Sequence, residues 1–394
     1  MLDDCSRNTR RRCVSILLIA VVLSGAFALA GCKSATPTPE VPTVPPATRT
    51  PRPTFTPVAT ATPAPTVTLV PTLTPVAPTA TLLPTASPTP TVNANANPLT
   101  GLSVSDPALL ERRILAVRIG NDTTARPQDG LGLADIVYEE IMDGWTLTRF
   151  TALYLGTNVD QIRPIRSARL STLEIVPQYD AAAVHSGASD HIRWLIAQAG
   201  FVDLDEYYHH EPYSVLADHD WRSRMYTSVE RLHAYLTARN LERGKLTSGY
   251  SFDATAPAGQ PANSIHIPYP QLCVVDWAYD ATSGRYLRTM QGAPHLEGLT
   301  GAQIGAENVI VFYTEHKKTD IVEDSLGSTA IDIVMTGEGR AQLLRDGVVQ
   351  EVTWKRTAAN EPILYYDATG AEVPLKPGQT WIQLVPVDYQ VEIK

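Results

Sequence analysis

Apolar residues recur at helical spacing in several stretches between residues 98 and 250. The stretch "SDHIRWLIAQAG" (189–200) repeats apolar residues at positions 192, 195, 196 and 199 behind Ser189, a residue type that caps helices. The stretch "TSVERLHAYLTARNLERG" (227–244) begins with the capping-box pattern Thr227-x-x-Glu230. A shorter helical pattern covers 168–176 and ends before Pro177. The spacing therefore predicts three helices in this part of the chain.

Strand patterns accompany these helices and dominate after about residue 250. Residues 114–121 form an apolar run, and the runs at 134–142 and 147–155 flank Asp143-Gly144, a dipeptide typical of hairpin turns. Further strand patterns lie at 264–269, 272–280, 284–290, 308–316, 329–335, 348–356, 362–367, 380–386 and 389–393. We predict an α+β protein, with a mixed α/β N-terminal half (98–250) and a mostly antiparallel β C-terminal half (251–394).

The N-terminus carries the pattern of a bacterial lipoprotein signal. Arg10, Arg11 and Arg12 precede an apolar run at 14–28, and "LAGC" (29–32) matches the lipobox. We predict that residues 1–31 are a signal peptide and that Cys32 is acylated. The protein is then anchored by lipid to the cell membrane and faces the extracytoplasmic side. The alternative is an uncleaved transmembrane anchor, for which the apolar stretch at 14–30 is at the short limit.

Residues 32–97 have the composition of a tether. Sixteen prolines fall between Pro37 and Pro90, among Thr, Ala and Val. Proline at this density excludes helices and removes the donors that a sheet requires. We predict a disordered linker rich in polyproline-II conformation.

Charge and cysteine content narrow the classes of function. The net charge is −9, and residues 1–98 carry a net +4, so the remainder carries −13. Such an acidic body argues against nucleic acid as a partner. Cys273 is the only cysteine in the body and lies in an apolar run, which predicts a buried, inert thiol. We predict no cofactor and no metal: no phosphate-binding glycine loop, HExxH or EF-hand pattern occurs, and the His-containing stretch at 207–220 fits no standard ligand spacing.

Three arginines in "IRPIRSAR" (162–169) are the first candidate site. Arg163, Arg166 and Arg169 follow one another at three-residue spacing in an acidic protein. Guanidinium groups bind carboxylates and phosphates in a planar, bidentate manner, so the cluster is a candidate receiver for an anionic ligand. Acidic residues nearby in the chain, such as Asp160 and Asp180, offer the alternative of internal salt bridges.

Two further stretches contain candidate polar residues. In "HSGASDH" (185–191), an apolar run leads through small residues to a helix start, so His185 and Ser186 are candidates for ligand binding. His185, Asp190, His295 and Glu297 are candidates for proton transfer in a catalytic site, because a histidine beside a carboxylate can move protons near neutral pH. The alternative for each is a structural role, with Ser189 as a helix cap.

Several long motifs resemble the YerB-like family of bacterial lipoproteins, a two-part domain of unknown function. The matching stretches are "NPLTGL" (97–102), "RPQDGLGLADIVYEE" (126–140), "TRFTALYL" (148–155), "IRPIRSAR" (162–169), "YDAAAVHSGAS" (179–189), "GAPHLEGLTGAQIGAENVIV" (292–311) and "TWKR…PILYYDATG…LKPGQTWIQLVP" (353–386). The family pattern usually has Gly-Pro-Val or similar before Arg-Ser-Ala-Arg, and Arg163 departs from it. The resemblance implies an envelope lipoprotein of α+β fold and no particular reaction.

These observations favour a tethered extracytoplasmic binding or scaffold module. Its expected partners are the membrane, through the lipid anchor, and an anionic cell-wall component or an envelope protein. The alternative is a cell-envelope hydrolase or transferase that uses His185 and His295 with a nearby carboxylate. If both histidines meet in one cleft, the enzyme is favoured, whereas arginines in an open groove favour binding.

Overall fold

In the computed structural model, the described residues are 95–242, 249–270 and 272–394. The predicted signal peptide, the acylation site Cys32 and the tether up to residue 94 lie outside the described residues. Within the described part, strands are much more abundant than helices, and both types are present, in agreement with the predicted α+β class.

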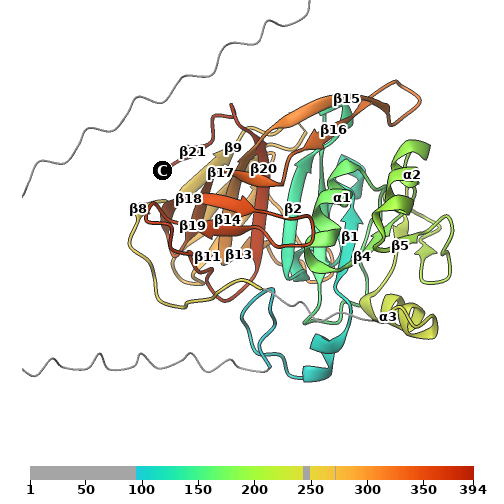
Figure 1. Ribbon diagram of the computed structural model, residues 1–394, viewed down its shortest axis with the longest axis horizontal. Helices are drawn as coiled ribbons and strands as arrows, with labels where there is room; N and C mark the ends of the chain where they lie inside the picture. Colours follow the sequence, from blue (N-terminus) through green and yellow to red (C-terminus); the bar gives the residue numbers. More distant parts are fainter. Residues whose placement is uncertain (1–94, 243–248, 271) are drawn as a thin grey trace, which may run out of the picture. The chain divides into compact units, whose positions relative to one another are not determined.

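A mixed sheet of eleven strands forms the centre of the fold (Figure 1). Its strand order is β19-β18-β17-β14-β20-β2-β3-β1-β4-β5, and β8 pairs with β18. The strands are β1 (Leu115–Ile119), β2 (Ile136–Ile141), β3 (Thr148–Tyr154), β4 (Ala182–His185), β5 (Val202–Asp205), β8 (Gln260–Pro261), β14 (Asn308–Thr314), β17 (Gly337–Arg345), β18 (Val348–Arg356), β19 (Leu364–Tyr366) and β20 (Thr380–Pro386).

The smaller sheets surround this centre. A six-stranded sheet has the order β12-β11-β10-β9-β21, with β13 paired to β11, and two hairpins are formed by β15 with β16 and by β6 with β7. Their bounds are β6 (Ser214–Val215), β7 (Met225–Tyr226), β9 (Ser264–Ile267), β10 (Val275–Asp280), β11 (Arg285–Met290), β12 (Ala293–Pro294), β13 (Gly305–Ala306), β15 (His316–Val322), β16 (Thr329–Ile333) and β21 (Glu392–Ile393).

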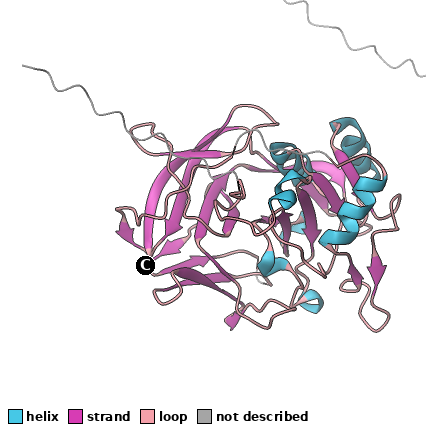
Figure 2. Cartoon of the chain, turned by 90° about the horizontal axis from the view of Figure 1, so that it is seen from below, coloured by secondary structure: helices cyan, strands magenta, loops and turns pink. Residues whose placement is uncertain are grey.

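The described residues form three α-helices, all in the N-terminal half, as the periodicity predicts. They are α1 (Leu170–Ile175), α2 (Asp190–Ala199) and α3 (Val229–Ala238), and the 3-10 turns are η1 (Pro107–Glu111), η2 (Thr123–Ala125), η3 (Leu131–Leu133), η4 (Asp143–Trp145) and η5 (Val176–Tyr179). Ser189 caps α2 as predicted, but the cap of α3 is Ser228 and not Thr227. Figure 2 shows the longer helices gathered at one side, whereas strands and loops make up the other.

The two halves of the body share the large sheet. Strand β20, near the C-terminus, lies parallel between β14 and β2, with Thr380 opposite both Asn308 and Ile136. All seven residues of β14 and of β20 are buried, as expected for central strands that are covered on both faces. The parallel pairing of β20 with β14 is an exception to the mostly antiparallel pairing of the C-terminal half. The large sheet therefore contains strands from both sides of residue 250, the boundary between the two halves that the sequence suggests.

An aromatic core fills the space beside the centre of the large sheet. The indole of Trp381 on β20 packs edge-on against Phe150 and Trp277, with ring centroids 5.6 and 5.3 Å apart. Cys273 is buried as predicted, and its Sγ accepts a hydrogen bond from the Thr148 amide at 3.2 Å. Burial raises the pKa of the Cys273 thiol, which keeps it in the neutral, unreactive form.

Candidate functional site

The arginine motif lies where the parallel strands of the N-terminal half end. Strands β1, β4 and β5 run parallel, and the motif follows β3 and leads into α1. The loop that contains Ser186 and Gly187 leaves the end of β4 next to the motif. Its Ser186 amide donates to the Arg166 carbonyl at 3.1 Å, and the Ala168 amide donates to the Gly187 carbonyl at 3.0 Å. The carboxyl ends of parallel strands are the usual place for ligand sites in such sheets.

Arg163 forms an internal ion pair. Its Nε lies 2.6 Å from Asp129 Oδ2, and its Nη1 donates to the Ser223 carbonyl at 3.0 Å. Both side chains of the pair are largely buried. Arg163 therefore holds three loops together, and its guanidinium is occupied by groups of this protein.

Arg169 also has internal partners. Its Nε lies 2.5 Å from Asp143 Oδ1 and 3.5 Å from Glu323 Oε2. Glu323 directly follows β15, so the pair connects the C-terminal hairpin β15–β16 to the start of α1. Figure 1 shows this hairpin reaching toward the α1 and α2 side of the fold. Burial raises the pKa of the Glu323 carboxyl, whereas the charge of Arg169 lowers it. The pairing with Arg169 therefore stabilises the ionised carboxylate.

Two buried arginines that the sequence reasoning missed, Arg118 and Arg149, donate hydrogen bonds to the backbone of the motif. Arg118 on β1 pairs with Glu140 on β2, and burial lowers the pKa of Arg118 to about 9. Arg149 on β3 donates to the Ser167 carbonyl at 2.9 Å. No sequence signal marked these two arginines, because β1 and β3 each contain only one charged residue in a largely apolar run. These bonds fix the backbone between Arg166 and Arg169.

Arg166 differs from its two neighbours. Its nearest carboxylate, on Asp122, is 3.9 Å from Nε, and among the described residues its side chain makes no hydrogen bond. Its guanidinium carbon lies 5.1 Å from the ring centroid of Trp221, and that of Arg222 lies 5.4 Å from the same ring. Trp221 is 60% exposed. Arg166, whose side chain is 18% exposed, is thus the member of the motif without a hydrogen-bonded carboxylate, and it lies beside an exposed indole.

A second group of an arginine and aromatic rings lies beside the Ser186–Gly187 loop. Arg193 on α2 pairs with Asp205 at 2.9 Å and lies 4.8 and 5.9 Å from the ring centroids of Tyr207 and Tyr208. These tyrosines are 68% and 61% exposed. The Ser186–Gly187 loop contacts both arginines: the Ser186 amide donates to the Arg166 carbonyl at 3.1 Å, and a Cβ added to Gly187 would lie 3.5 Å from Arg193. We call Arg166, Arg193, Tyr207, Tyr208 and Trp221 the arginine–aromatic surface.

His185 and Ser186 lie at this surface in different ways. The His185 ring is fully buried, with Nε2 2.7 Å from Asp203 Oδ1 and Nδ1 3.0 Å from the Gly187 carbonyl. Ser186 is partly exposed, and its Oγ donates to Glu206 at 3.3 Å. Asp190 is exposed in the first turn of α2. His185 therefore shapes the loop from inside, whereas Ser186 and Asp190 reach its outer side.

His295 and Glu297 belong to a separate network that joins the two halves. His295 Nε2 lies 2.7 Å from Gln128 Oε1, and its Nδ1 lies 2.6 Å from Arg288. Burial and the Arg288 charge hold the pKa of His295 well below its usual range, so the ring is neutral. The Glu297 carboxylate accepts from the amides of Gly130 and Gly132, both at 2.6 Å. His185 and His295 share no partner among the described residues, and the structure does not bring them together.

The tryptophans show what the sequence reasoning missed. Of the six, Trp277, Trp354 and Trp381 are buried, but Trp194 and Trp221 are exposed. Trp221 stands between Asp220 and Arg222 in the sequence, and charged neighbours on both sides are the signal that could have placed it at the surface.

Within the residues that the structure describes, no helix has the length and apolar character needed to cross a membrane.

The fold and its surface define a two-part α+β protein whose halves share one mixed sheet. The chain belongs to the family of the protein of unknown function DUF3048: residues 99–242 match its N-terminal domain and residues 265–382 its C-terminal domain. The YerB-like resemblance is thereby confirmed. A Bacillus subtilis (strain 168) relative named "Putative lipoprotein YerB" is 28% identical over 306 residues, which cover 73% of this chain and 86% of the relative. The crystal structure of YerB from Bacillus subtilis matches with a TM-score of 0.66 and 25% identity, over 75% of this chain and 99% of that one.

Proposed function

We propose that this protein is a lipid-anchored extracytoplasmic module that binds an anionic polysaccharide of the cell envelope at the arginine–aromatic surface. The lipobox at Cys32 and the name of the Bacillus relative support the anchor. The observation that carries the binding role is Arg166. Its guanidinium lacks a hydrogen-bonded carboxylate among the described residues and lies against an exposed indole.

A glycan fits this surface better than a compact anion such as free phosphate. Carboxylates surround the arginines, including Asp122, Asp205 and Glu206, and would repel a small dense charge. The same carboxylates can accept hydrogen bonds from sugar hydroxyls. The exposed rings of Trp221 and Tyr207 offer flat apolar faces on which sugar rings can stack. A carboxylate substituent on the glycan then meets Arg166 in a bidentate pair.

A binding experiment with two matched ligands tests this function. The full chain is titrated with soluble fragments of a uronic-acid polysaccharide, whose carboxylates are on the sugar rings, and with the same fragments after amidation of their carboxylates. We expect Arg166→Gln to weaken binding of the acidic fragments about tenfold or more, since a charge-assisted pair contributes about 1.5–3 kcal/mol. The same substitution should change binding of the amidated fragments little. Trp221→Ala should weaken binding of both ligands.

Arg340→Gln is the control variant, because Arg340 also lies over an aromatic ring, that of Tyr313 at 4.5 Å, on an exposed part of β17. Melting curves of all variants show whether they are folded. Equal affinities of Arg166→Gln and Arg340→Gln for the acidic fragments would rule out the assigned role of Arg166. Absence of binding to either ligand by the parent protein would rule out the glycan.

A further inference from the structure

A small cavity of about 350 Å³ is lined by residues from both halves of the body. The N-terminal half contributes Arg126 and Pro127, from the connection between β1 and β2. The C-terminal half contributes the end of β11, the strand β12 and the two residues that follow it, His295 and Leu296. The volume is at the lower end of the range of small-molecule sites, about 300–1,000 Å³.

The walls of this cavity are largely apolar. Pro127, Met290, Pro294 and Leu296 contribute hydrocarbon, and the Leu296 side chain remains 41% exposed. His295 adds no free polar atom, because its Nε2 lies 2.7 Å from Gln128 Oε1 and its Nδ1 accepts from Arg288 at 2.6 Å. A concave, mostly apolar surface with few polar groups is typical of a site for a small organic molecule.

Arg126 is the only charged residue among the described residues that line the cavity. Its Nε donates to Asn121 Oδ1 at 3.0 Å, and its Nη2 donates to the carbonyls of Asn121 and Leu272 at 2.9 and 2.6 Å. These neutral acceptors hold one edge of the guanidinium in place. Its Nη1 makes no hydrogen bond among the described residues and keeps accessible surface. Nη1 is therefore the polar atom that Arg126 can offer to a ligand in the cavity.

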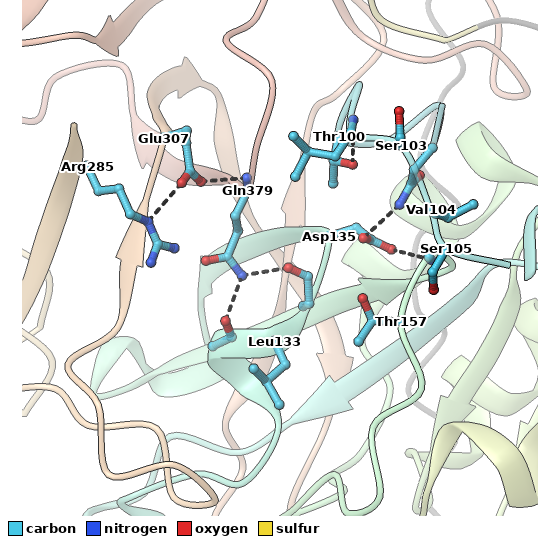
Figure 3. Close-up of a pocket in the computed structure, with 15 residues that line it drawn as sticks. Thr100, Ser103, Val104, Ser105, Leu133, Asp135, Thr157, Arg285, Glu307 and Gln379 are labelled. Carbon is cyan, nitrogen blue, oxygen red and sulfur yellow. Dashed lines mark hydrogen bonds and ion pairs between the residues drawn. The ribbon is translucent and has the colours of Figure 1, made fainter. Parts of the chain in front are cut away.

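No carboxylate forms an ion pair with Arg126 among the described residues. Glu139, a buried acid whose charge acts on Arg126, is already paired with Arg288 at 2.7 Å. The larger cavity of about 560 Å³ that Figure 3 shows is different, because its cation Arg285 is paired with Glu307 at 2.9 Å. The cavity at Arg126 thus combines apolar walls with a positive charge that has no carboxylate partner, and such a charge favours an anion beside it.

We propose that this cavity binds a small organic anion, whose apolar body fills the cavity and whose carboxylate accepts a hydrogen bond from Nη1 of Arg126. The apolar body is stabilised by leaving water for the surfaces of Met290, Pro294 and Leu296. The carboxylate supplies the negative charge that Arg126 lacks. A glycan acid of the kind proposed for the arginine–aromatic surface does not fit these walls, since its hydroxyl groups would lose their hydrogen bonds. The two sites are independent, so either proposal can fail without the other.

Titration calorimetry of the full chain at pH 7 with benzoate, benzamide and acetate tests the site. Benzoate and benzamide have nearly the same size and differ in charge, whereas acetate has the charge without the ring. We expect benzoate to bind at least about tenfold more tightly than benzamide, because its hydrogen bond to Arg126 is charge-assisted. It should also bind at least about tenfold more tightly than acetate, because its ring is removed from water. Equal affinity of benzoate with either of the other probes would contradict the proposal.

Two variants locate the binding. Arg126→Gln should weaken benzoate binding about tenfold or more and leave benzamide binding nearly unchanged, whereas Arg340→Gln is the control for loss of a surface arginine. Ala293 is exposed in the lining, so Ala293→Trp fills the cavity without removing a buried contact and should abolish benzoate binding. Ala281→Trp, in the exposed turn between β10 and β11, is its matched control and should bind benzoate normally.

Melting curves show which variants are folded, and if Arg126→Gln is not, Ala293→Trp decides. Full benzoate binding by Ala293→Trp, or no benzoate binding by the parent protein, would overturn the proposal. Loss of benzoate binding in Arg166→Gln, with normal binding in Arg126→Gln, would place the anion at the arginine–aromatic surface and would overturn it as well.

Discussion

Replacing Arg169 by alanine tests whether the arginine motif is divided between structural and binding roles. The substitution removes the only cation that pairs with Asp143 and Glu323 among the described residues. The Asp143 side chain is 8% exposed and that of Glu323 is fully buried. Leaving buried carboxylates without their partner costs about 3–5 kcal/mol. At about 2 °C per kcal/mol for a folded part of this size, the melting temperature should fall by roughly 6–10 °C.

Arg166→Ala is the matched comparison, since it removes the same side chain three residues earlier. Its nearest carboxylate is 3.9 Å away and is not hydrogen-bonded to it, so we expect a loss of about 1 kcal/mol or less. Differential scanning calorimetry of the two variants and the parent, without ligand, measures the difference. Because burial raises the pKa of Glu323, Arg169→Ala should regain part of its stability as the pH falls and Glu323 takes up a proton. Equal losses in both variants would contradict the division of roles.

Three further predictions concern the anchor, a buried acid and the contact between the halves. Cys32→Ser should abolish labelling by a clickable fatty acid, and unchanged labelling would exclude acylation at this residue. Asp135 binds its proton more tightly in the folded state, so its contribution to stability is complete below about pH 4 and falls by about 3 kcal/mol as the pH rises through 6. Asp135→Asn should show a correspondingly flatter profile of melting temperature against pH. Glu297→Gln replaces one of the two acceptor oxygens by an NH2 group, so one of the Gly130 and Gly132 amides loses its acceptor, and the change should cost about 1–3 kcal/mol in urea unfolding. A neutral result would mean that this contact does not join the halves.

Long-range hydrogen bonds explain the presence of His295 and Glu297 in the Gly-rich loop. His295 and Glu297 have the composition of a proton-transfer pair, yet their partners Gln128, Gly130 and Gly132 lie about 165 positions earlier in the chain. Nothing in the local pattern distinguishes a catalytic carboxylate from one that accepts two backbone amides. The distinction depends on which loop of the other half packs against it.

The sequence by itself determined the elements whose signals are local. Apolar spacing and Ser189 placed α2, and Asp143-Gly144 between two apolar runs placed the β2–β3 hairpin, because side-chain periodicity and turn preference act over a few residues. The strand β17 was missed, since its first half, "GEGR", is polar and exposed and resembles a loop. The α3 cap was misplaced by one residue, because Thr227 and Ser228 are both capping residue types.

Only the tertiary structure decided what the three arginines do. Arg163, Arg166 and Arg169 have the same residue type and the same spacing, but their nearest carboxylates lie at 2.6, 3.9 and 2.5 Å. Asp129 and Asp122 come from the connection between β1 and β2, and Asp143 comes from the turn between β2 and β3. The energy of an ion pair depends steeply on distance and burial, and neither quantity is encoded in the spacing along the chain. Likewise, β20 lies between β14 and β2, where its backbone N–H and C=O groups pair with those of both buried strands. Its position about 240 residues after β2 in the chain gives no indication of this pairing.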